Sequence, residues 1–314
     1  MHIPDGFIDA KTAVVTGAIS AVGVGLALRQ LRRELPPRRV PLLGLSAAFL
    51  FAAQMVNFPV AGGTSGHLLG GVLVAALLGP AAGVVVLTAV LLVQCFLFAD
   101  GGLTALGANI LNMALVGTVG GWMIYRALSR CLPGVRGQVA AVAFAGWCST
   151  VLAALACAGQ LAWSSTVPWS AAVRAMAGIH MLIGLGEGLI SALVFLAILR
   201  ARPELIVGNE GAGAARAGGV VRLGLVASLG LVLFVAPFAC PWPDGLEKVA
   251  AKLGIEQRSG TILPAPLADY ALPGCKSSAV ATAAAGALGA LLVFGLALSL
   301  SRVLVPKERK VVQR

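Results

Sequence analysis

Nine stretches rich in apolar residues run along the 314-residue chain, separated by shorter polar segments. A helix needs about 20 predominantly apolar residues to cross a membrane, and only the third stretch is clearly too short to cross alone. The pattern predicts an all-α polytopic membrane protein. The expected spans are Thr12–Leu28, Pro41–Val56, Gly66–Gly79, Ala81–Phe98, Leu103–Tyr125, Gln138–Ala162, Ala171–Leu199, Arg222–Cys240 and Ser278–Val303.

The short third stretch draws attention to the loop before it. Irregular backbone at membrane depth is tolerated only where it is buried in protein or lines a cavity. We therefore expect the loop Ala61–Ser65 to be buried, and we regard it as a candidate site.

Composition agrees with a membrane protein, because 59% of the residues are hydrophobic and 11% are charged. The net charge of +11 is distributed unevenly among the loops. Seventeen of the 23 Lys and Arg residues fall in alternate connections and the C-terminal tail. Since positive loops stay inside, the N-terminus is predicted outside and the C-terminus inside, as nine spans require. The positive charge thus reports topology rather than nucleic-acid binding.

A polar Gly/Ala-rich segment separates the first seven spans from the last two. It lacks apolar periodicity, which is typical of a linker. We therefore expect a seven-helix transmembrane domain over 1–202, a cytoplasmic linker over 203–221, and a two-helix accessory domain with an extracytoplasmic loop over 222–314.

The first two residues can chelate a metal. The α-amine of Met1, the backbone amide of His2 and the His2 Nδ1 form five- and six-membered rings around one ion. Such a nitrogen set suits square-planar Ni(II) or Cu(II), with Co(II) a possible relative. No cleavable signal peptide is apparent, so Met1 is expected to keep its amine. The alternative is that His2 follows the initiator methionine by chance.

His67 is the candidate for the missing fourth ligand, since the predicted topology puts it at the same membrane face as His2. A hydrogen-bonded histidine at a helix end is the alternative. Thr64, Ser65 and Asp5 are candidates to orient an imidazole, as metal-bound histidines require. Asp5 alternatively only solvates the outer surface.

His180 and Glu187 lie seven residues apart, and hence on one face of the seventh span. Ionisable residues inside a membrane are functional candidates by default. Because Glu187 is expected near mid-membrane, we favour a polar lock between helices, or support of the ligands, over direct ligation.

Small residues recur every four positions on the first span, at Ala13, Gly17, Ala21 and Gly25. Such a face lets another helix approach closely. The helix could belong to a partner protein or to this chain. Cys240 and Cys275 flank the predicted outer loop, either as a disulfide or as free thiols.

Several classes of protein are disfavoured by what the sequence lacks. There is no GxxxxGK[ST] loop for ATP and no HExxH or GxSxG motif of a hydrolase. The competing hypothesis is a metal-independent secondary permease or a structural membrane subunit. A vitamin-binding subunit is disfavoured, because only 6% of the residues are aromatic.

Several segments resemble the CbiM/NikM family of substrate-binding components of energy-coupling factor transporters for cobalt and nickel. They are MHIPDGF at the N-terminus, GGTSGHLLGG at 62–71, FADGGLTALGANILNM at 98–113 and HMLIGLGEGLISALV at 180–194. The segment 243–247 resembles the PDGLE signature of the small NikN-like subunit, here fused behind the linker.

The resemblance implies a non-enzymatic transport subunit that binds metal through the Met1 amine, the His2 amide and imidazole, and His67. It implies Ni(II) as transported substrate rather than Co(II), because Pro4 and Asp5 differ from the MHIMEG start of cobalt-type relatives. It also implies a transmembrane coupling component docked on the small-residue face, and separate ATPase subunits. The expected location is the inner membrane of a prokaryote, in contact with lipid, without organic cofactor or nucleic acid.

Overall fold

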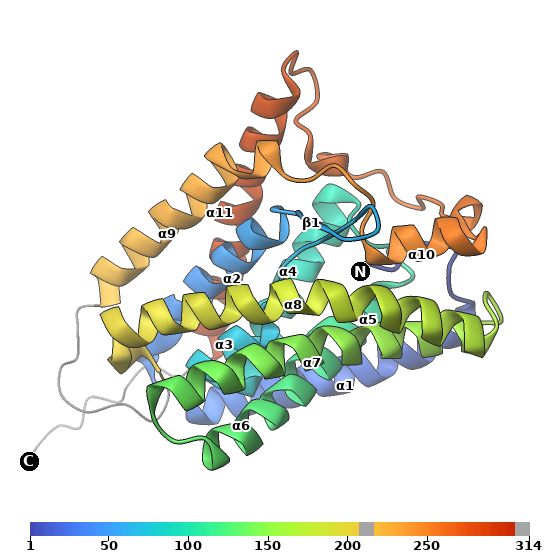
Figure 1. Cartoon of the computed structure of the whole chain (residues 1–314). Coiled ribbons are helices and arrows are strands. Elements are labelled where there is room, and N and C mark those ends of the chain that lie inside the picture. Colours follow the sequence, from blue (N-terminus) through green and yellow to red (C-terminus); the bar gives the residue numbers. More distant parts are fainter. Residues whose placement is uncertain (207–216, 305–314) are drawn as a thin grey trace, which may run out of the picture.

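The computed structural model describes residues 1–206 and 217–304, which form helices and one two-stranded hairpin (Figure 1). Most of the predicted linker therefore lies outside the described residues. The principal helices are α1 (Ala10–Glu34), α2 (Val40–Gln54), α3 (Gly71–Leu78), α4 (Pro80–Phe98), α7 (Gly134–Trp163), α8 (Trp169–Ala201), α9 (Ala217–Phe234), α10 (Gly245–Leu253) and α11 (Ser278–Leu304). A further long helix joins α5 (Leu106–Asn109), the wider π-helical η2 (Ile110–Gly120) and α6 (Gly121–Cys131).

Seven helices in the described ranges are long and apolar enough to cross a membrane. They correspond to seven of the nine predicted spans. The remaining two, α2 with 15 residues and α3 with eight, are shorter, which confirms the shortness of the third stretch and adds the second to it. All eight residues of α3 are buried, so this helix is surrounded by protein rather than by lipid.

The loop before α3 is an antiparallel hairpin of β1 (Phe58–Val60) and β2 (Thr64–Gly66). Its turn uses Gly62 and Gly63, whose φ angles of +90° and +70° favour glycine. All three residues of β2 are buried, whereas the turn is exposed. Of the loop Ala61–Ser65, which was expected to be buried, only Thr64 and Ser65 of β2 are buried. The pairing with β1 supplies partners for the backbone of β2 there.

The described helices of the second part of the chain pack against the first part. Helices α9 and α11 lie against α2, and α11 also contacts α4. Between them, the chain runs through the turns η4 (Ala236–Phe238), η5 (Glu256–Arg258) and η6 (Ala268–Tyr270) and through α10, which lies against α8 (Figure 1). The remaining single turns are η1 (Pro37–Arg39) and η3 (Pro203–Leu205).

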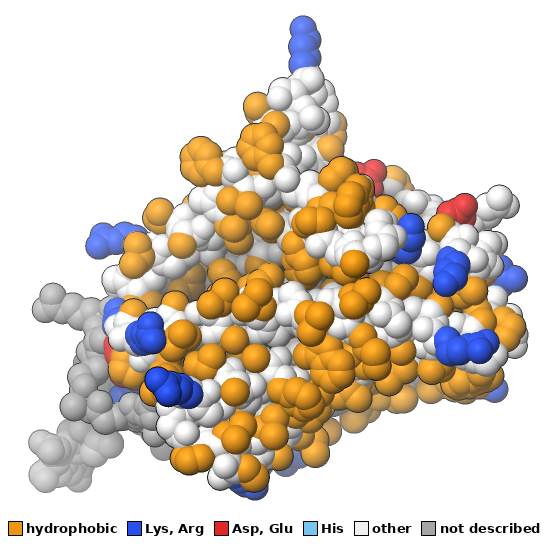
Figure 2. Space-filling view, in the orientation of Figure 1, with side chains coloured by type: hydrophobic (Ala, Val, Ile, Leu, Met, Phe, Trp, Pro, Cys, Tyr) orange, Lys and Arg blue, Asp and Glu red, His pale blue; other side chains and the backbone are white. Residues whose placement is uncertain are grey.

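Apolar side chains are spread widely over the face of the molecule seen in Figure 2. On α8, for example, Leu185, Leu189 and Leu193 are each more than half exposed and recur every four residues, hence on one helix face. Lys and Arg side chains gather mainly toward the ends of the molecule (Figure 2). This distribution is typical of a protein whose outer surface contacts lipid.

Helix α1 turns much of its small-residue face away from the rest of the chain. A Cβ added at Gly17 or Gly25 would meet nothing within 4 Å, and Ala21 is exposed, although Ala13 packs partly against the core. The close approach within the chain comes instead from Gly107 of α5, where a Cβ would lie 2.4 Å from Gly17 Cα. Internal packing therefore leaves the outer side of this face open.

Candidate metal centre

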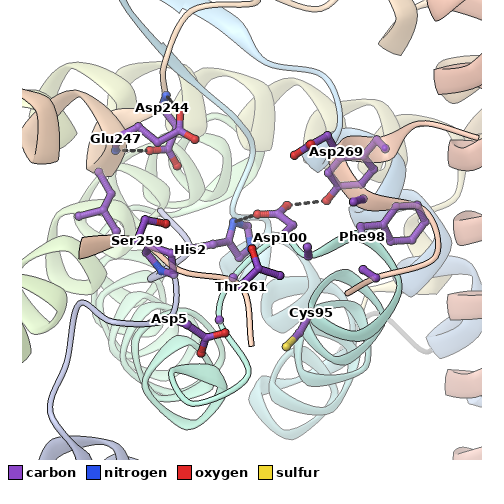
Figure 3. A pocket seen from close by; sticks show the side chains of 18 of the residues that line it. His2, Asp5, Cys95, Phe98, Asp100, Asp244, Glu247, Ser259, Thr261 and Asp269 are labelled. Carbon is purple, nitrogen blue, oxygen red and sulfur yellow. Dashed lines mark hydrogen bonds and ion pairs between the residues drawn. The ribbon is translucent and has the colours of Figure 1, made fainter. Parts of the chain in front are cut away.

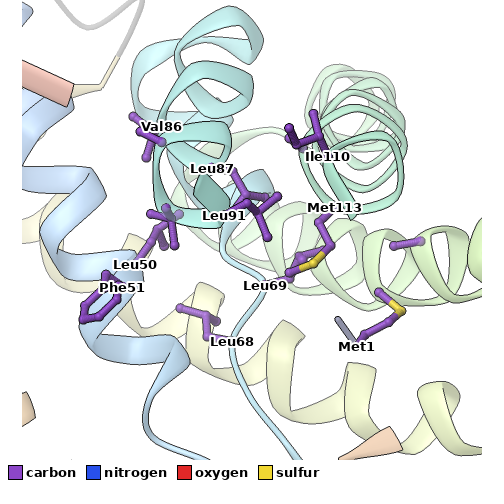
Figure 4. Close-up of a cluster of buried hydrophobic side chains, with 14 of the residues drawn as sticks. Met1, Leu50, Phe51, Leu68, Leu69, Val86, Leu87, Leu91, Ile110 and Met113 are labelled. Atoms are coloured by element: carbon purple, nitrogen blue, oxygen red, sulfur yellow. The ribbon is translucent and has the colours of Figure 1, made fainter. Parts of the chain in front are cut away.

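The N-terminal segment is drawn into the protein. Met1 is 6% exposed and Ile3 is fully buried, and the Met1 side chain reaches the apolar core (Figure 4). Ile3 N–H donates to Asn109 Oδ1 at 2.8 Å, and Asn109 Nδ2 donates back to the Ile3 carbonyl at 3.1 Å. Gly102 N–H donates to the same carbonyl. These bonds fix the position of residues 1 and 2.

The structure brings together the three residues predicted to bind a metal. The Met1 nitrogen lies 3.2 Å from His67 Nε2, and the imidazoles of His2 and His67 stack with centroids 5.5 Å apart. His67 follows β2 and is partly buried. Its other nitrogen, Nδ1, is 3.2 Å from the Leu68 carbonyl, so Nε2 is the nitrogen that faces the amine.

His2 is oriented differently from the chelate expected from the sequence. Its Nδ1 lies 3.0 Å from Asp100 Oδ1, and its buried Nε2 has no hydrogen-bond partner. Asp100 Oδ2 in turn accepts from the hydroxyl of Tyr270. A six-membered ring through Nδ1 requires the imidazole to turn away from Asp100, since one nitrogen cannot serve both.

The Met1 amine also contacts the second part of the chain. Its nitrogen is 2.5 Å from Asp244 Oδ2, while Asp244 Oδ1 accepts from the backbone N–H of Glu247. The Glu247 side chain accepts from the N–H of Asp244, which completes a capping box at the start of α10. One carboxylate thus begins a helix and holds the chain terminus.

Thr64 and Ser65 do not orient an imidazole. The hydroxyls of Thr64 and Ser65 donate to the carbonyls of Pro243 and Trp242, at 3.0 and 2.7 Å. Ser65 N–H also donates to Pro243. The prediction was wrong about their partner because these side chains meet a segment far away in sequence.

Asp5 contacts neither imidazole, and it is only 5% exposed. Its Oδ1 accepts from the backbone N–H and the hydroxyl of Thr104, at 2.8 and 2.6 Å. Its backbone carbonyl accepts from Gly260 N–H. Asp5 therefore ties the N-terminal segment to two loops, a structural role in place of orienting an imidazole or solvating the outer surface.

Glu187 of α8 lies behind the His67 segment. Its two oxygens accept from the backbone N–H groups of Leu69 and Gly70, at 2.5 and 2.9 Å. These groups precede α3, where no earlier turn supplies a carbonyl. His180 lies on the same face of α8 as Glu187 and is buried. Its Nδ1 is 2.8 Å from the Met176 carbonyl oxygen. Glu187 thus links α8 to the segment before α3, whereas the contact of His180 Nδ1 lies within α8 and its buried Nε2 has no hydrogen-bond partner among the described residues.

Ion pairing determines the protonation of the centre. Burial opposes charge on the Met1 amine and on Asp244, but each favours the charged form of the other. The pKa of the amine is therefore raised, and that of Asp244 lies well below its usual range. The pKa of Asp100 is likewise low, since its pairing with His2 outweighs burial. Burial and the positive amine lower the pKa of His67 to about 3, so His67 is neutral and can offer a lone pair.

Side chains alone do not form a metal cage here. Among the described residues, no group of three or more His, Cys, Asp or Glu side chains is placed to hold an ion. A metal centre at this position would need backbone donors, such as the Met1 amine, in addition to the side chains of His2 and His67.

Two family models match the chain. The model described as cobalt uptake substrate-specific transmembrane region, CbiM, matches residues 2–205, and the PDGLE domain model matches residues 218–305. The chain belongs to the CbiM family, with a PDGLE domain fused behind it.

Two relatives match the chain over almost its whole length and have the same fused organisation. A fused nickel transport protein from Rhodobacter capsulatus is 31% identical and covers 95% of this chain and 97% of its own. A protein from Archaeoglobus fulgidus, which also carries the name of a fused nickel transport protein, is 38% identical. The match covers 96% of this chain and 98% of the relative. The crystal structure of a truncated transition metal transporter, 32% identical, matches 64% of this chain and 99% of its own, with a TM-score of 0.59.

These matches confirm the resemblance inferred from the sequence and place the chain among metal transport proteins. Three residues of the centre had no predicted role: Asp100, Asp244 and Tyr270. Asp100 and Asp244 stand within the quoted segments FADGG and PDGLE. Both are acidic residues in loops expected at the same membrane face as His2, and this was the signal in the sequence that could have placed them in the centre.

Glu187→Gln is expected to destabilise the protein by about 1–3 kcal/mol, because the amide leaves one backbone N–H of residues 69–70 without an acceptor. Thermal unfolding in detergent measures this change. Glu204→Gln removes an acidic group from the partly exposed pair with Arg202 and is the control, expected to change stability by less than about 1 kcal/mol. Equal effects of the two substitutions would contradict the role assigned to Glu187.

Proposed function

We propose that this protein captures Ni(II), with Co(II) as the alternative cargo, at the extracytoplasmic face of an ATP-driven importer. The observation that carries the proposal is the 3.2 Å distance between the Met1 amine and His67 Nε2, with His2 stacked beside them. The proposed ligands are the amine, the His2 amide and imidazole, and His67. Four nitrogens suit a square-planar d⁸ ion such as Ni(II).

The proposed topology has nine membrane segments, with the N-terminus outside and the C-terminus inside. The uneven distribution of Lys and Arg supports this orientation. The short α2 and α3 fit the scheme because longer helices surround them. The proposed domains are 1–202 for metal binding, 203–221 as cytoplasmic linker and 222–314 as accessory domain, in the inner membrane of a prokaryote.

The proposed partners are a transmembrane coupling component and separate ATPase subunits, since the chain has no phosphate-binding loop of its own. The alternative is a secondary permease or structural subunit that needs no metal. Reconstitution of the chain alone in liposomes distinguishes them. Uptake driven only by an ion gradient would favour the alternative.

One alanine added before Met1 is expected to weaken Ni(II) binding by more than about 100-fold. The new amine would stand one residue away, about 3.5 Å along the chain, with a peptide bond in its former place. Isothermal titration measures the affinity, and the intact mass establishes whether Met1 is retained and unformylated.

The matched control is one alanine added after Arg314, which leaves the amine unchanged. His67→Ala should weaken binding similarly to the N-terminal extension, while both proteins stay folded by circular dichroism. Unchanged affinity in the extended protein would exclude the amine as a ligand.

Affinity for Ni(II) is expected to fall as the pH falls between about 8 and 6, roughly tenfold per pH unit for each proton that the metal displaces. The amine contributes because its raised pKa leaves it protonated in the free protein. His67, with a pKa of about 3, contributes no proton in this range. Titrations across this range measure the slope, and a pH-independent affinity would contradict an amine ligand.

Gly17→Leu with Gly25→Leu is expected to reduce co-purification with the coupling component about tenfold or more, because the leucines fill the open face of α1. Ni(II) binding should persist. Gly178→Leu on α8, where an added Cβ also meets nothing within 4 Å, is the control. Equal co-purification of the two variants would place the docking surface elsewhere.

A further inference from the structure

A cavity of about 1030 Å³ lies beside the candidate centre, between the first domain and the loop of the second. Six of the twelve acidic residues of the chain line it, and Figure 3 shows most of them around His2. No Lys or Arg of the described residues lines the cavity, although the net charge of the chain is +11. The acidic residues are Asp5, Asp100, Asp244, Glu247, Glu256 and Asp269.

The negative charge of this cavity is only partly balanced by its neighbours. Asp244 is paired with the Met1 amine, and Asp100 with His2. Asp5 is held by neutral donors of Thr104. The side chains of Glu256 and Asp269 are exposed and make no hydrogen bond or ion pair with the described residues. A net negative potential therefore remains in the cavity.

Glu247 is affected by this excess of negative charge. Burial and the neighbouring Asp244 carboxylate raise its pKa above the ordinary value for glutamic acid. A cation in the cavity would relieve the repulsion between such carboxylates.

The side chain of His2, itself one of the proposed ligands, points to a cation rather than to a merely acidic surface. The His2 side chain lines the same cavity and is only 7% exposed, and its Nε2 is buried without any hydrogen-bond partner. A buried nitrogen left unpaired in a folded protein calls for a ligand, because an unsatisfied polar atom is costly. Because the residues that line the cavity are acidic, that ligand should be positively charged.

We infer that this cavity is an antechamber that collects hydrated divalent cations and supplies them to the nitrogen ligands. The inference rests on the proposed function, and it gives the second domain a part in it. Four of the six carboxylates come from that domain: Asp244, Glu247, Glu256 and Asp269. The volume is ample, since an ion with six waters occupies roughly 200 Å³ at about 30 Å³ per water.

Charges of this kind act on the rate of capture more than on retention. A cleft lined by one sign of charge raises the local concentration of counter-ions and accelerates association by ten- to a thousandfold. Salt screens the effect, with a Debye length of about 8 Å at physiological ionic strength. Dissociation of the captured ion is controlled by the nitrogen ligands and should be independent of the distant carboxylates.

The test variant is the full chain with Glu256→Gln and Asp269→Asn, which touch none of the proposed ligands. Stopped-flow measurements of Ni(II) binding should show an association rate reduced about three- to tenfold at low ionic strength. The difference should vanish at high salt, and the dissociation rate should not change.

The matched control is Glu34→Gln with Glu204→Gln, which removes the same charge from residues that do not line the cavity. Its association rate should equal that of the unaltered protein. The antechamber is excluded if the control is slowed as much as the test variant, if the test variant associates at the original rate, or if its dissociation rate changes instead.

Mn(II), which does not require nitrogen ligands, separates this inference from the proposed function. In the His67→Ala protein, Mn(II) should still enhance water-proton relaxation, and the enhancement should disappear when Glu256→Gln and Asp269→Asn are added. If the unaltered protein does not bind Ni(II) but still gives the Mn(II) signal, the nitrogen site is rejected and the antechamber is not. Absence of the Mn(II) signal would reject the antechamber.

Discussion

A buried positive charge at the start of the chain constrains the whole molecule. The Met1 amine is almost fully enclosed, and removing an ion from water costs several kcal/mol unless a counter-charge is close. Asp244 supplies that charge from the second domain, 243 positions away along the chain. Because the same carboxylate caps α10, the first residue of the protein and the fold of the second domain depend on each other.

A similar rule applies within the helix bundle. The chain before α3 is irregular, and its backbone groups must find partners inside the protein. Glu187 satisfies two of them, and the Gln54 amide donates to the Leu69 carbonyl. Gln54 also accepts from Gln94. Thus His67 stands on a segment that is held from both sides by polar groups of neighbouring helices, which gives a ligand little freedom to move.

The sequence predicted the helices well because apolar length is a property of each stretch alone. The short third helix, the common location of His2 and His67, and the buried polar residues also follow from local pattern and topology. The partners of Thr64, Ser65 and Asp5 do not. Those of Thr64 and Ser65 depend on how the loop between α9 and α11 folds back over the first domain. The partner of the Asp5 carboxylate, Thr104, depends on how the N-terminal segment folds over the loop before α5. No periodicity in these segments encodes the contacts. Asp100 and Asp244 could be found as acidic residues near the site, but not paired with specific nitrogens.

Charge balance explains how one buried position can suit both an empty and a loaded state. Without metal, the Met1 ammonium and Asp244 sum to zero charge. With the proposed ligands, Ni(II) contributes two positive charges, the deprotonated His2 amide removes one, and Asp244 removes the other. A metal-bound amine still carries N–H groups that can donate to Asp244, so the contact between the domains need not break on loading. Since the charge summed over these groups is unchanged, their burial need not favour either state. Exchange between the states requires that protons leave as the ion enters and that the His2 imidazole turns away from Asp100.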